Sequence, residues 1–148
     1  MFESTASEKL PNLVAIAARS YLEAFSRADP DEIAALVTED FVNEHTAALG
    51  SGCTGREQYR SRLPGFLADM GDLRYEIENL VVEDTQAAAF YTMTAQWKGL
   101  EPISVRGVMH LGINAGLIAH RTDYWDSAAF LTQVSQEARE ALAAFGIS

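Results

Sequence analysis

Cysteine is almost absent from this sequence: Cys53 is the only one among 148 residues. The chain therefore forms no internal disulfide, which suits a reducing compartment. The opening MFESTASEKL has neither the basic segment nor the apolar segment of a secretion signal. No later stretch approaches the ~20 apolar residues of a membrane span. We therefore expect a cytoplasmic protein with no membrane partner.

Basic residues are also scarce, with 11 Lys and Arg against 21 Asp and Glu and a formal net charge of -10. Because nucleic-acid affinity depends largely on clustered Lys and Arg, we expect no nucleic-acid partner. His, Cys and carboxylate residues do not show the spacing of a metal site, and no Gly-rich loop fits a phosphate site. The sequence thus predicts no metal and no cofactor.

The remaining composition is that of an ordinary globular protein, with 48% apolar residues. A chain of this length buries a sizeable core without disulfides or metals, and we expect one domain spanning residues 1–148.

Two helices are expected near the start. From Leu13 the apolar residues recur at i, i+3 and i+4, which predicts a helix whose inner stripe includes Leu13, Ile16 and Tyr21. Asp29 to Glu32 then reads as a helix start, with Asp29 as N-cap and Pro30 at the first helical position. Thr54 to Glu57 predicts the start of a third helix, which Pro64 is expected to kink or divide.

Strands dominate the rest of the chain. Residues 41–46 alternate as a short strand, which places Phe41, Asn43 and His45 on one face. After Gly71 four longer strands are expected at residues 73–83, 87–97, 104–113 and 117–125, and the short connections make them antiparallel. An Ala-rich terminal helix begins after Asp126. Helical segments packed on a mainly antiparallel sheet define an α+β fold.

The stretch GLIAHRTDYWD, residues 116–126, is the main candidate for a functional site. Alternation along a strand puts Arg121, Asp123 and Trp125 on one face. Such a face is either a polar pocket wall, with Asp123 as the chemical group, or a solvated outer face with a salt bridge.

The last hairpin gives a first estimate of what faces Asp123. If Asn114 and Ala115 form the loop, Arg106 lies opposite Asp123, and His110 shares that face four residues along, roughly 13 Å away. A ligand between His110 and Asp123 would touch both.

The two segments 28–45, ADPDEIAALVTEDFVNEH, and 116–126 resemble the NTF2-like superfamily, and within it the SnoaL-like polyketide cyclases and the ketosteroid isomerases. The resemblance extends from about residue 13 to residue 133. It implies an NTF2-like, or cystatin-like, cone in which a curved sheet wraps around N-terminal helices and encloses a pocket.

The resemblance also implies site residues. Tyr21 is similar in position to the oxyanion-hole tyrosine of ketosteroid isomerases, His45 to their general base and Trp125 to a pocket aromatic. Val108 stands where they carry a protonated aspartic acid. The pair of Asp123 and His110 resembles the acid/base pair of SnoaL-like cyclases.

Asn43 and Asp123 also resemble site residues of the limonene epoxide hydrolase-like members. Phe41 replaces their tyrosine, and the segment FYTMTAQW supplies neither their Arg nor their Asp.

Two functions follow as expectations. The first is an enzyme, polyketide cyclase-like or steroid delta-isomerase-like, that moves a proton next to the carbonyl of a small hydrophobic molecule. Its expected catalytic residues are Asp123, His110 and Tyr21, and its expected substrate-binding residues are Asn43, His45, Arg106, Trp125 and Phe41. The alternative is a non-catalytic ligand-binding or dimerisation module. We also expect a homodimer through the outer face of the sheet, because the strands carry apolar residues on both faces.

Overall fold

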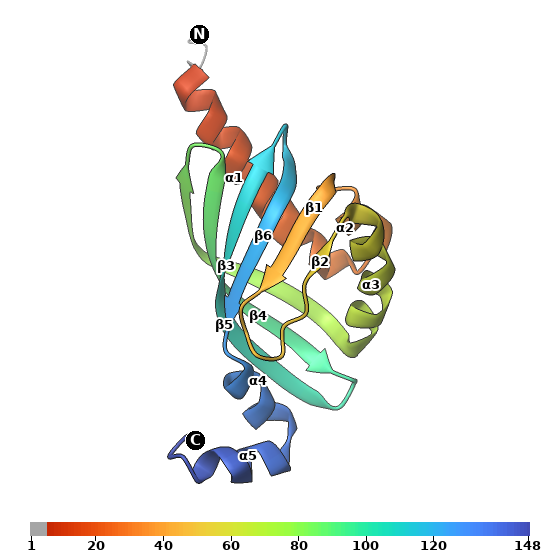
Figure 1. The fold of residues 1–148 in the computed structure, drawn as a ribbon, viewed down its shortest axis with the longest axis vertical. Helices are drawn as coiled ribbons and strands as arrows, with labels where there is room; N and C mark the ends of the chain where they lie inside the picture. Colours follow the sequence, from red (N-terminus) through yellow and green to blue (C-terminus); the bar gives the residue numbers. More distant parts are fainter. Residues whose placement is uncertain (1–5) are drawn as a thin grey trace.

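The computed structural model describes residues 6–148, with side chains from residue 9 onward. Within that range an open, curved sheet is packed on one face by helices, which confirms the expected α+β class (Figure 1). The helices are α1 (Ala6–Ala24), the 3-10 turn η1 (Phe25–Arg27), α2 (Pro30–Ala34), α3 (Arg56–Asp69), α4 (Ser127–Val134) and α5 (Gln136–Ala143). The strands are β1 (Val37–His45), β2 (Cys53–Thr54), β3 (Met70–Glu83), β4 (Gln86–Trp97), β5 (Glu101–Asn114) and β6 (Leu117–Trp125).

The six strands lie in the order β2-β1-β6-β5-β4-β3. The last four form an antiparallel meander with short turns, as the sequence predicts, whereas β1 pairs parallel to β6. The register shifts between Ile77 and Asn79 on β3 and again at Ala119 on β6, which has no partner between the pairs Gly112–His120 and Ile113–Ile118. Such bulges bend a strand and increase its twist. They give the sheet the curvature that makes room for a cavity on its inner face.

Helix α1 packs across the inner face of strands β3 to β6. Its buried side is formed by Val14, Ala18, Tyr21 and Leu22, which confirms that Tyr21 points inward. The expected stripe is otherwise rotated by about one residue, because Leu13 and Ile16 are 59% and 60% exposed. The helix carries two adjacent apolar stripes, and packing on the sheet selects only one of them.

Helices α2 and α3 close one side of the sheet. Asp29 caps α2 as expected, since its carboxylate accepts hydrogen bonds from the backbone N–H groups of Asp31 and Glu32. Helix α3 starts at Arg56 as predicted, but Gly55 with a φ of 94° is its N-cap, not Thr54. Pro64 neither divides the assigned helix nor ends it.

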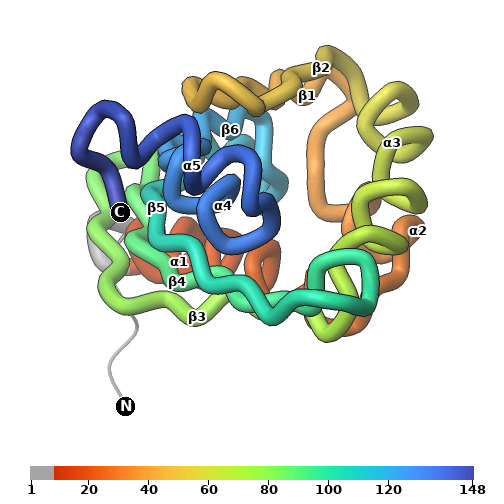
Figure 2. The backbone as a smooth tube through the Cα atoms, turned by 90° about the horizontal axis from the view of Figure 1, so that it is seen from below, coloured from red at the N-terminus to blue at the C-terminus, as the bar shows by residue number. Residues whose placement is uncertain are grey.

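The chain ends in two short helices instead of the single one expected. Asp126 caps α4 and Ser135 caps α5. Phe130 anchors α4 by packing edge-on against the rings of Trp97 and Trp125. Figure 2 shows α4 and α5 at one end of the molecule, over β5 and β6. No helix within residues 6–148 has the length and apolar character that crossing a membrane requires.

Candidate functional site

A cavity of about 390 Å³ lies between the inner face of the sheet and helices α3 and α4. Most of its wall is apolar and aromatic, including Phe25, Phe66, Met93, Trp97, Val105 and Phe130. Polar side chains of β1 and β6 meet in one part of the wall, where Asn43, His45, Arg121 and Asp123 line the space. The arrangement is that of a small-molecule site, in which a few placed polar groups orient a largely apolar ligand.

Asp123 faces this cavity because β6 alternates as the sequence indicated. Arg121, Asp123 and Trp125 line the cavity, while His120 and Tyr124 are exposed on the other face. The backbone carbonyl of Asp123 accepts hydrogen bonds from the N–H and the hydroxyl of Thr46 at 3.0 and 3.2 Å. These bonds fix β6 against the end of β1 and therefore hold the carboxylate in place.

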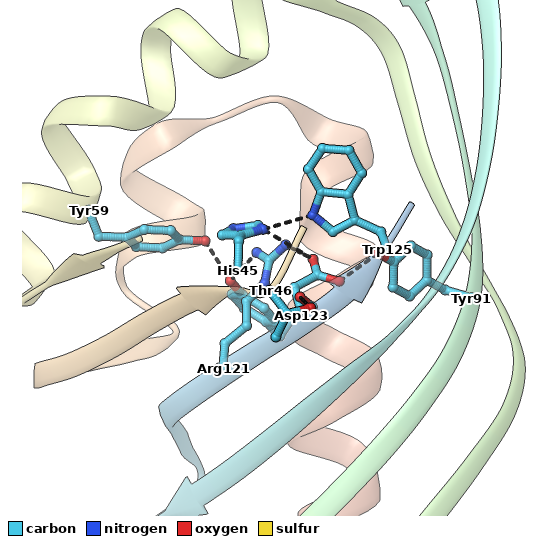
Figure 3. Close-up of polar contacts among 8 residues, drawn as sticks. His45, Thr46, Tyr59, Tyr91, Arg121, Asp123 and Trp125 are labelled. Atoms are coloured by element: carbon cyan, nitrogen blue, oxygen red, sulfur yellow. Dashed lines mark hydrogen bonds and ion pairs between the residues drawn. The ribbon is translucent and has the colours of Figure 1, made fainter. Parts of the chain in front are cut away.

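The carboxylate of Asp123 is 2% exposed and is held by two neighbours (Figure 3). The Tyr91 hydroxyl donates to Oδ1 at 2.6 Å, and the Arg121 guanidinium donates to Oδ2 at 2.6 Å. The charge of Arg121 balances that of Asp123, so the buried pair is neutral as a whole. Each carboxylate oxygen keeps a second lone-pair direction for a further partner.

Arg121 joins the carboxylate to a second hydrogen-bonded group. It donates to the Tyr21 hydroxyl at 2.9 Å, and its guanidinium carbon lies 5.8 and 5.7 Å from the ring centroids of Tyr21 and Phe25. Burial acts to lower the pKa of Arg121, but Tyr21 and Asp123 outweigh it and raise this pKa well above its usual value. Arg121 is therefore a permanent buried cation.

His45 stands beside Asp123, its partner in the parallel pairing of β1 and β6. Its Nδ1 lies 4.0 Å from Asp123 Oδ2 and accepts a hydrogen bond from the Trp125 indole N–H at 3.1 Å. Burial, helped by the charge of Arg121 and opposed by that of Asp123, lowers the pKa of His45 to about 4. The ring is thus neutral at pH 7, and because Nδ1 is an acceptor its proton sits on Nε2.

Four of the residues named from the sequence line one cavity: Asn43, His45, Asp123 and Trp125. Tyr21 lies behind the cavity wall, completely buried, and reaches the site only through its hydroxyl. Phe41 is also completely buried and packs on the ring of Tyr59, with centroids 4.8 Å apart. These two residues support the wall from behind.

Arg106 and His110 are not in the cavity, and this corrects the predicted register. Both are exposed, Arg106 paired with Glu78 at 2.7 Å and His110 hydrogen-bonded to Gln86 at 2.7 Å. Met109, completely buried, stands opposite Asp123.

Two local features produce this change. The turn is Ala115-Gly116, one residue later than expected, and a bulge shifts the register beside Gly112. Moving the turn leaves each β5 residue on its expected face. The bulge, a single extra residue, exchanges the faces, because side chains alternate with a period of two.

Three tyrosines that line the cavity, Tyr59, Tyr75 and Tyr91, were not predicted as site residues from the sequence, and neither was Arg121. Tyr91 lies in FYTMTAQW, where alternation places it on the same buried face as Met93. Tyr59 follows a helical pattern with Leu63 and Phe66, at i, i+4 and i+7, and all three line the cavity. Both signals are present in the sequence, but they are equally typical of ordinary core residues.

The described part of the chain contains no set of side chains suited to bind a metal ion. Nowhere in it do three His, Cys, Asp or Glu side chains gather in a way that holds a metal ion.

Known structures share this fold. A protein with a ketosteroid isomerase-like fold from Catenulispora acidiphila, solved with trimethylamine, matches with a TM-score of 0.75 and 19% identity over 83% of this chain and 95% of its own. A protein described as a ketosteroid isomerase from Kribbella flavida matches at 0.64 and 26% identity over 78% of each chain. One from Xanthomonas campestris described as a polyketide cyclase matches at 0.68 and 23% identity, over 84% of this chain and 98% of its own. No curated protein matches the sequence.

The fold is therefore the NTF2-like cone, with a curved, unclosed mixed sheet and N-terminal helices. Residues 18–121 match the family model described as a SnoaL-like domain. The chain belongs to the SnoaL-like family, as the segments 28–45 and 116–126 suggested.

Proposed function

We propose that the protein is a small-molecule enzyme of cyclase or isomerase type that moves a proton next to the carbonyl group of a hydrophobic compound. The observation that carries this proposal is the position of Asp123, a carboxylate at the polar part of an otherwise largely apolar cavity. A positioned base in a largely apolar pocket suits proton abstraction from carbon.

In this proposal Asp123 removes a proton from the carbon beside the carbonyl. The electron pair of the C–H bond moves into an enolate, and the negative charge passes from the carboxylate to the substrate oxygen. In a β,γ-unsaturated ketone the enolate is conjugated with the C=C bond, and return of the proton to the γ-carbon moves that double bond and completes an isomerisation. Attack of the enolate carbon on a second carbonyl, followed by protonation of the new alkoxide, completes a cyclisation.

The neighbours of Asp123 support this role by holding the carboxylate in one orientation. Tyr91 and Arg121 each donate to one oxygen at 2.6 Å, so the group is positioned before a substrate enters. Trp125 and Phe130 supply an apolar wall beside it and pack edge to face, with centroids 6.4 Å apart.

A non-catalytic ligand-binding module is the second candidate, and one observation favours it. Both oxygens of Asp123 already have partners, and the residue is only 2% exposed. Buried ion pairs of this kind also occur as purely structural elements.

Deuterium incorporation separates the two candidates. 2-Tetralone and 1-phenylbutane-1,3-dione are incubated with the protein in D₂O, and loss of the α-proton signal is followed by ¹H NMR. If the protein is an enzyme, we expect deuterium exchange that depends on the protein, at a rate that is lower by ~10²–10⁴-fold in Asp123→Asn. Asp126→Asn is the matched control, because Asn also caps a helix and Asp126 only begins α4. If the ketones bind but no exchange occurs, the protein is the non-catalytic ligand-binding module.

A further inference from the structure

Two tyrosine hydroxyls meet behind the polar part of the cavity. Tyr59 comes from α3 and lines the cavity, whereas Tyr21 comes from α1 and is completely buried. Their oxygens are 2.5 Å apart, and either hydroxyl could supply the proton of this hydrogen bond. Figure 3 shows Tyr59 entering from α3, with its hydroxyl turned towards His45 and Arg121.

The direction of the bond follows from what else each hydroxyl contacts. Arg121, which has no acceptor atom in its guanidinium, donates to the Tyr21 oxygen at 2.9 Å. If Tyr59 also donated to Tyr21, the Tyr21 proton would be buried with no acceptor, which costs about 1–3 kcal/mol. The satisfied order is therefore Arg121 to Tyr21 to Tyr59.

This order leaves the Tyr59 proton with no protein acceptor among the described residues. Tyr59 lines the cavity, so a ligand oxygen is the partner that its hydroxyl can reach. Burial is the main cause that raises the pKa of Tyr59 well above its ordinary value, and the hydroxyl consequently stays protonated at all physiological pH values.

We propose that Tyr59 is the hydrogen-bond donor that receives the carbonyl oxygen of the substrate, and that Tyr21 and Arg121 are positioning residues that act through it. This assignment rests on the proposed function, because it names the group that faces the oxygen while Asp123 takes the proton from carbon. A donor that already accepts a hydrogen bond is polarised, which strengthens the bond that it makes. Negative charge that develops on the oxygen strengthens it further.

One cation, Arg121, connects the carboxylate of Asp123 with the hydrogen-bonded pair of Tyr21 and Tyr59. Arg121 contacts Asp123 Oδ2 at 2.6 Å and the Tyr21 oxygen at 2.9 Å, so its charge lies between the base and the relay to the donor. As the proton leaves carbon, negative charge moves from Asp123 to the substrate oxygen. Arg121 interacts with that charge at both positions. Phe41 keeps the Tyr59 ring in place from behind, with centroids 4.8 Å apart.

The infrared carbonyl stretch of a bound ketone tests the donor directly and needs no turnover. The probe is 2-acetylnaphthalene labelled with ¹³C at the carbonyl, and the spectrum of the complex is compared with that of the free ketone in hexane. We expect a clear shift to lower frequency in the wild-type protein. The shift should be largely lost in Tyr59→Phe and reduced in Tyr21→Phe, which keeps the donor but removes its relay.

Tyr124→Phe is the matched control, since Tyr124 is 50% exposed on the outer face, and it should keep the full shift. Thermal melts and near-UV circular dichroism establish that each variant is folded. Should Tyr59→Phe destabilise the protein too far, the smaller effect of Tyr21→Phe still tests the relay.

Each other result overturns the assignment. An unchanged shift in Tyr59→Phe removes the role of Tyr59, and its loss in His45→Gln instead assigns the donor to the His45 Nε2–H. Failure of the ketone to bind at all rejects the carbonyl pocket together with the donor. Asp123-dependent deuterium exchange with an unchanged shift in Tyr59→Phe leaves the proposed function standing and rejects this inference alone.

Discussion

The imidazole of His45 stays neutral well below its ordinary pKa. Its pKa is lowered from 6.5 to about 4 by burial and by Arg121, and the indole N–H of Trp125 occupies its Nδ1. In the unfolded chain the same imidazole takes up a proton near its ordinary pKa. The folded and unfolded states therefore bind different numbers of protons between pH 6.5 and pH 4.

This difference predicts how stability changes with pH. Above pH 6.5 the ring is neutral in both states and contributes nothing. As the pH falls towards 4 the unfolded state gains the proton first, so the folded state loses stability, by about 2 kcal/mol at pH 4.5. Urea unfolding at pH 7 and pH 4.5 measures the loss, and it should be smaller by that amount in His45→Gln. Equal losses in both proteins would mean that His45 is not held neutral.

Within the elements, Gly107 of β5 makes the position of Tyr91 possible. It pairs with Tyr91 on one side and with Trp125 on the other. A Cβ at this glycine would overlap the Tyr91 hydroxyl and would lie only 2.7 Å from both the Tyr91 Cζ and the Tyr124 carbonyl oxygen. The absence of a side chain lets the Tyr91 hydroxyl reach Asp123.

We therefore predict that Gly107→Ala displaces Tyr91 and costs about 1–3 kcal/mol of stability through overpacking. Gly112→Ala on the same strand is the control, because its Cβ would meet only the His120 Cβ at an ordinary 3.5 Å. Urea unfolding compares the two variants. Deuterium exchange should be slower in Gly107→Ala, because a displaced Tyr91 no longer orients the Asp123 carboxylate, and an unchanged exchange rate would show that Tyr91 has not moved.

The elements also show what sequence patterns can and cannot predict. Strand alternation correctly placed Arg121, Asp123 and Trp125 together, because a side-chain period of two needs no knowledge of the neighbouring strands. Predicting how β5 pairs with β6 also requires the position of the turn and of any bulge. Gly116 belongs in the turn, where Ala115 and Gly116 have φ values of 51° and 81°, as primed hairpin turns require.

The bulge beside Gly112 has no comparable signal in the sequence. Because this one extra residue was not predicted, Arg106 and His110 were expected in the cavity, whereas they lie on the outer face. Contacts between helices that are distant in the sequence could not be predicted either. Tyr21 and Tyr59 are 38 residues apart, and their hydrogen bond depends on how α1 and α3 pack.

At the scale of the whole molecule, the outer face of the sheet carries an apolar row. Phe90, Val108 and Tyr124 stand opposite one another on β4, β5 and β6, and Phe90 and Tyr124 are 39% and 50% exposed. Exposed aromatic and aliphatic groups in a continuous row are typical of an interaction surface.

We propose that two copies of the chain associate through this row, as the composition of the strands first suggested. Light scattering coupled to gel filtration should give a dimer mass at micromolar concentration. Tyr124→Glu and Phe90→Glu should each shift the mass to that of a monomer. Leu100 is 78% exposed and lies in the turn between β4 and β5, so Leu100→Glu should leave the dimer mass unchanged. A monomer mass for the wild-type protein would remove this proposal.

Proton transfer by Asp123 is tested by measuring the reaction rate separately from ligand binding. The single-turnover rate of deuterium exchange into 2-tetralone and the dissociation constant of the same ketone are measured for the wild-type protein and for Asp123→Asn. Asn retains an acceptor oxygen for Arg121 or Tyr91, and circular dichroism checks that the variant is folded. We predict a rate lower by ~10²–10⁴-fold with a nearly unchanged dissociation constant. An unchanged rate would show that Asp123 does not transfer the proton and would leave it as a structural partner of Arg121.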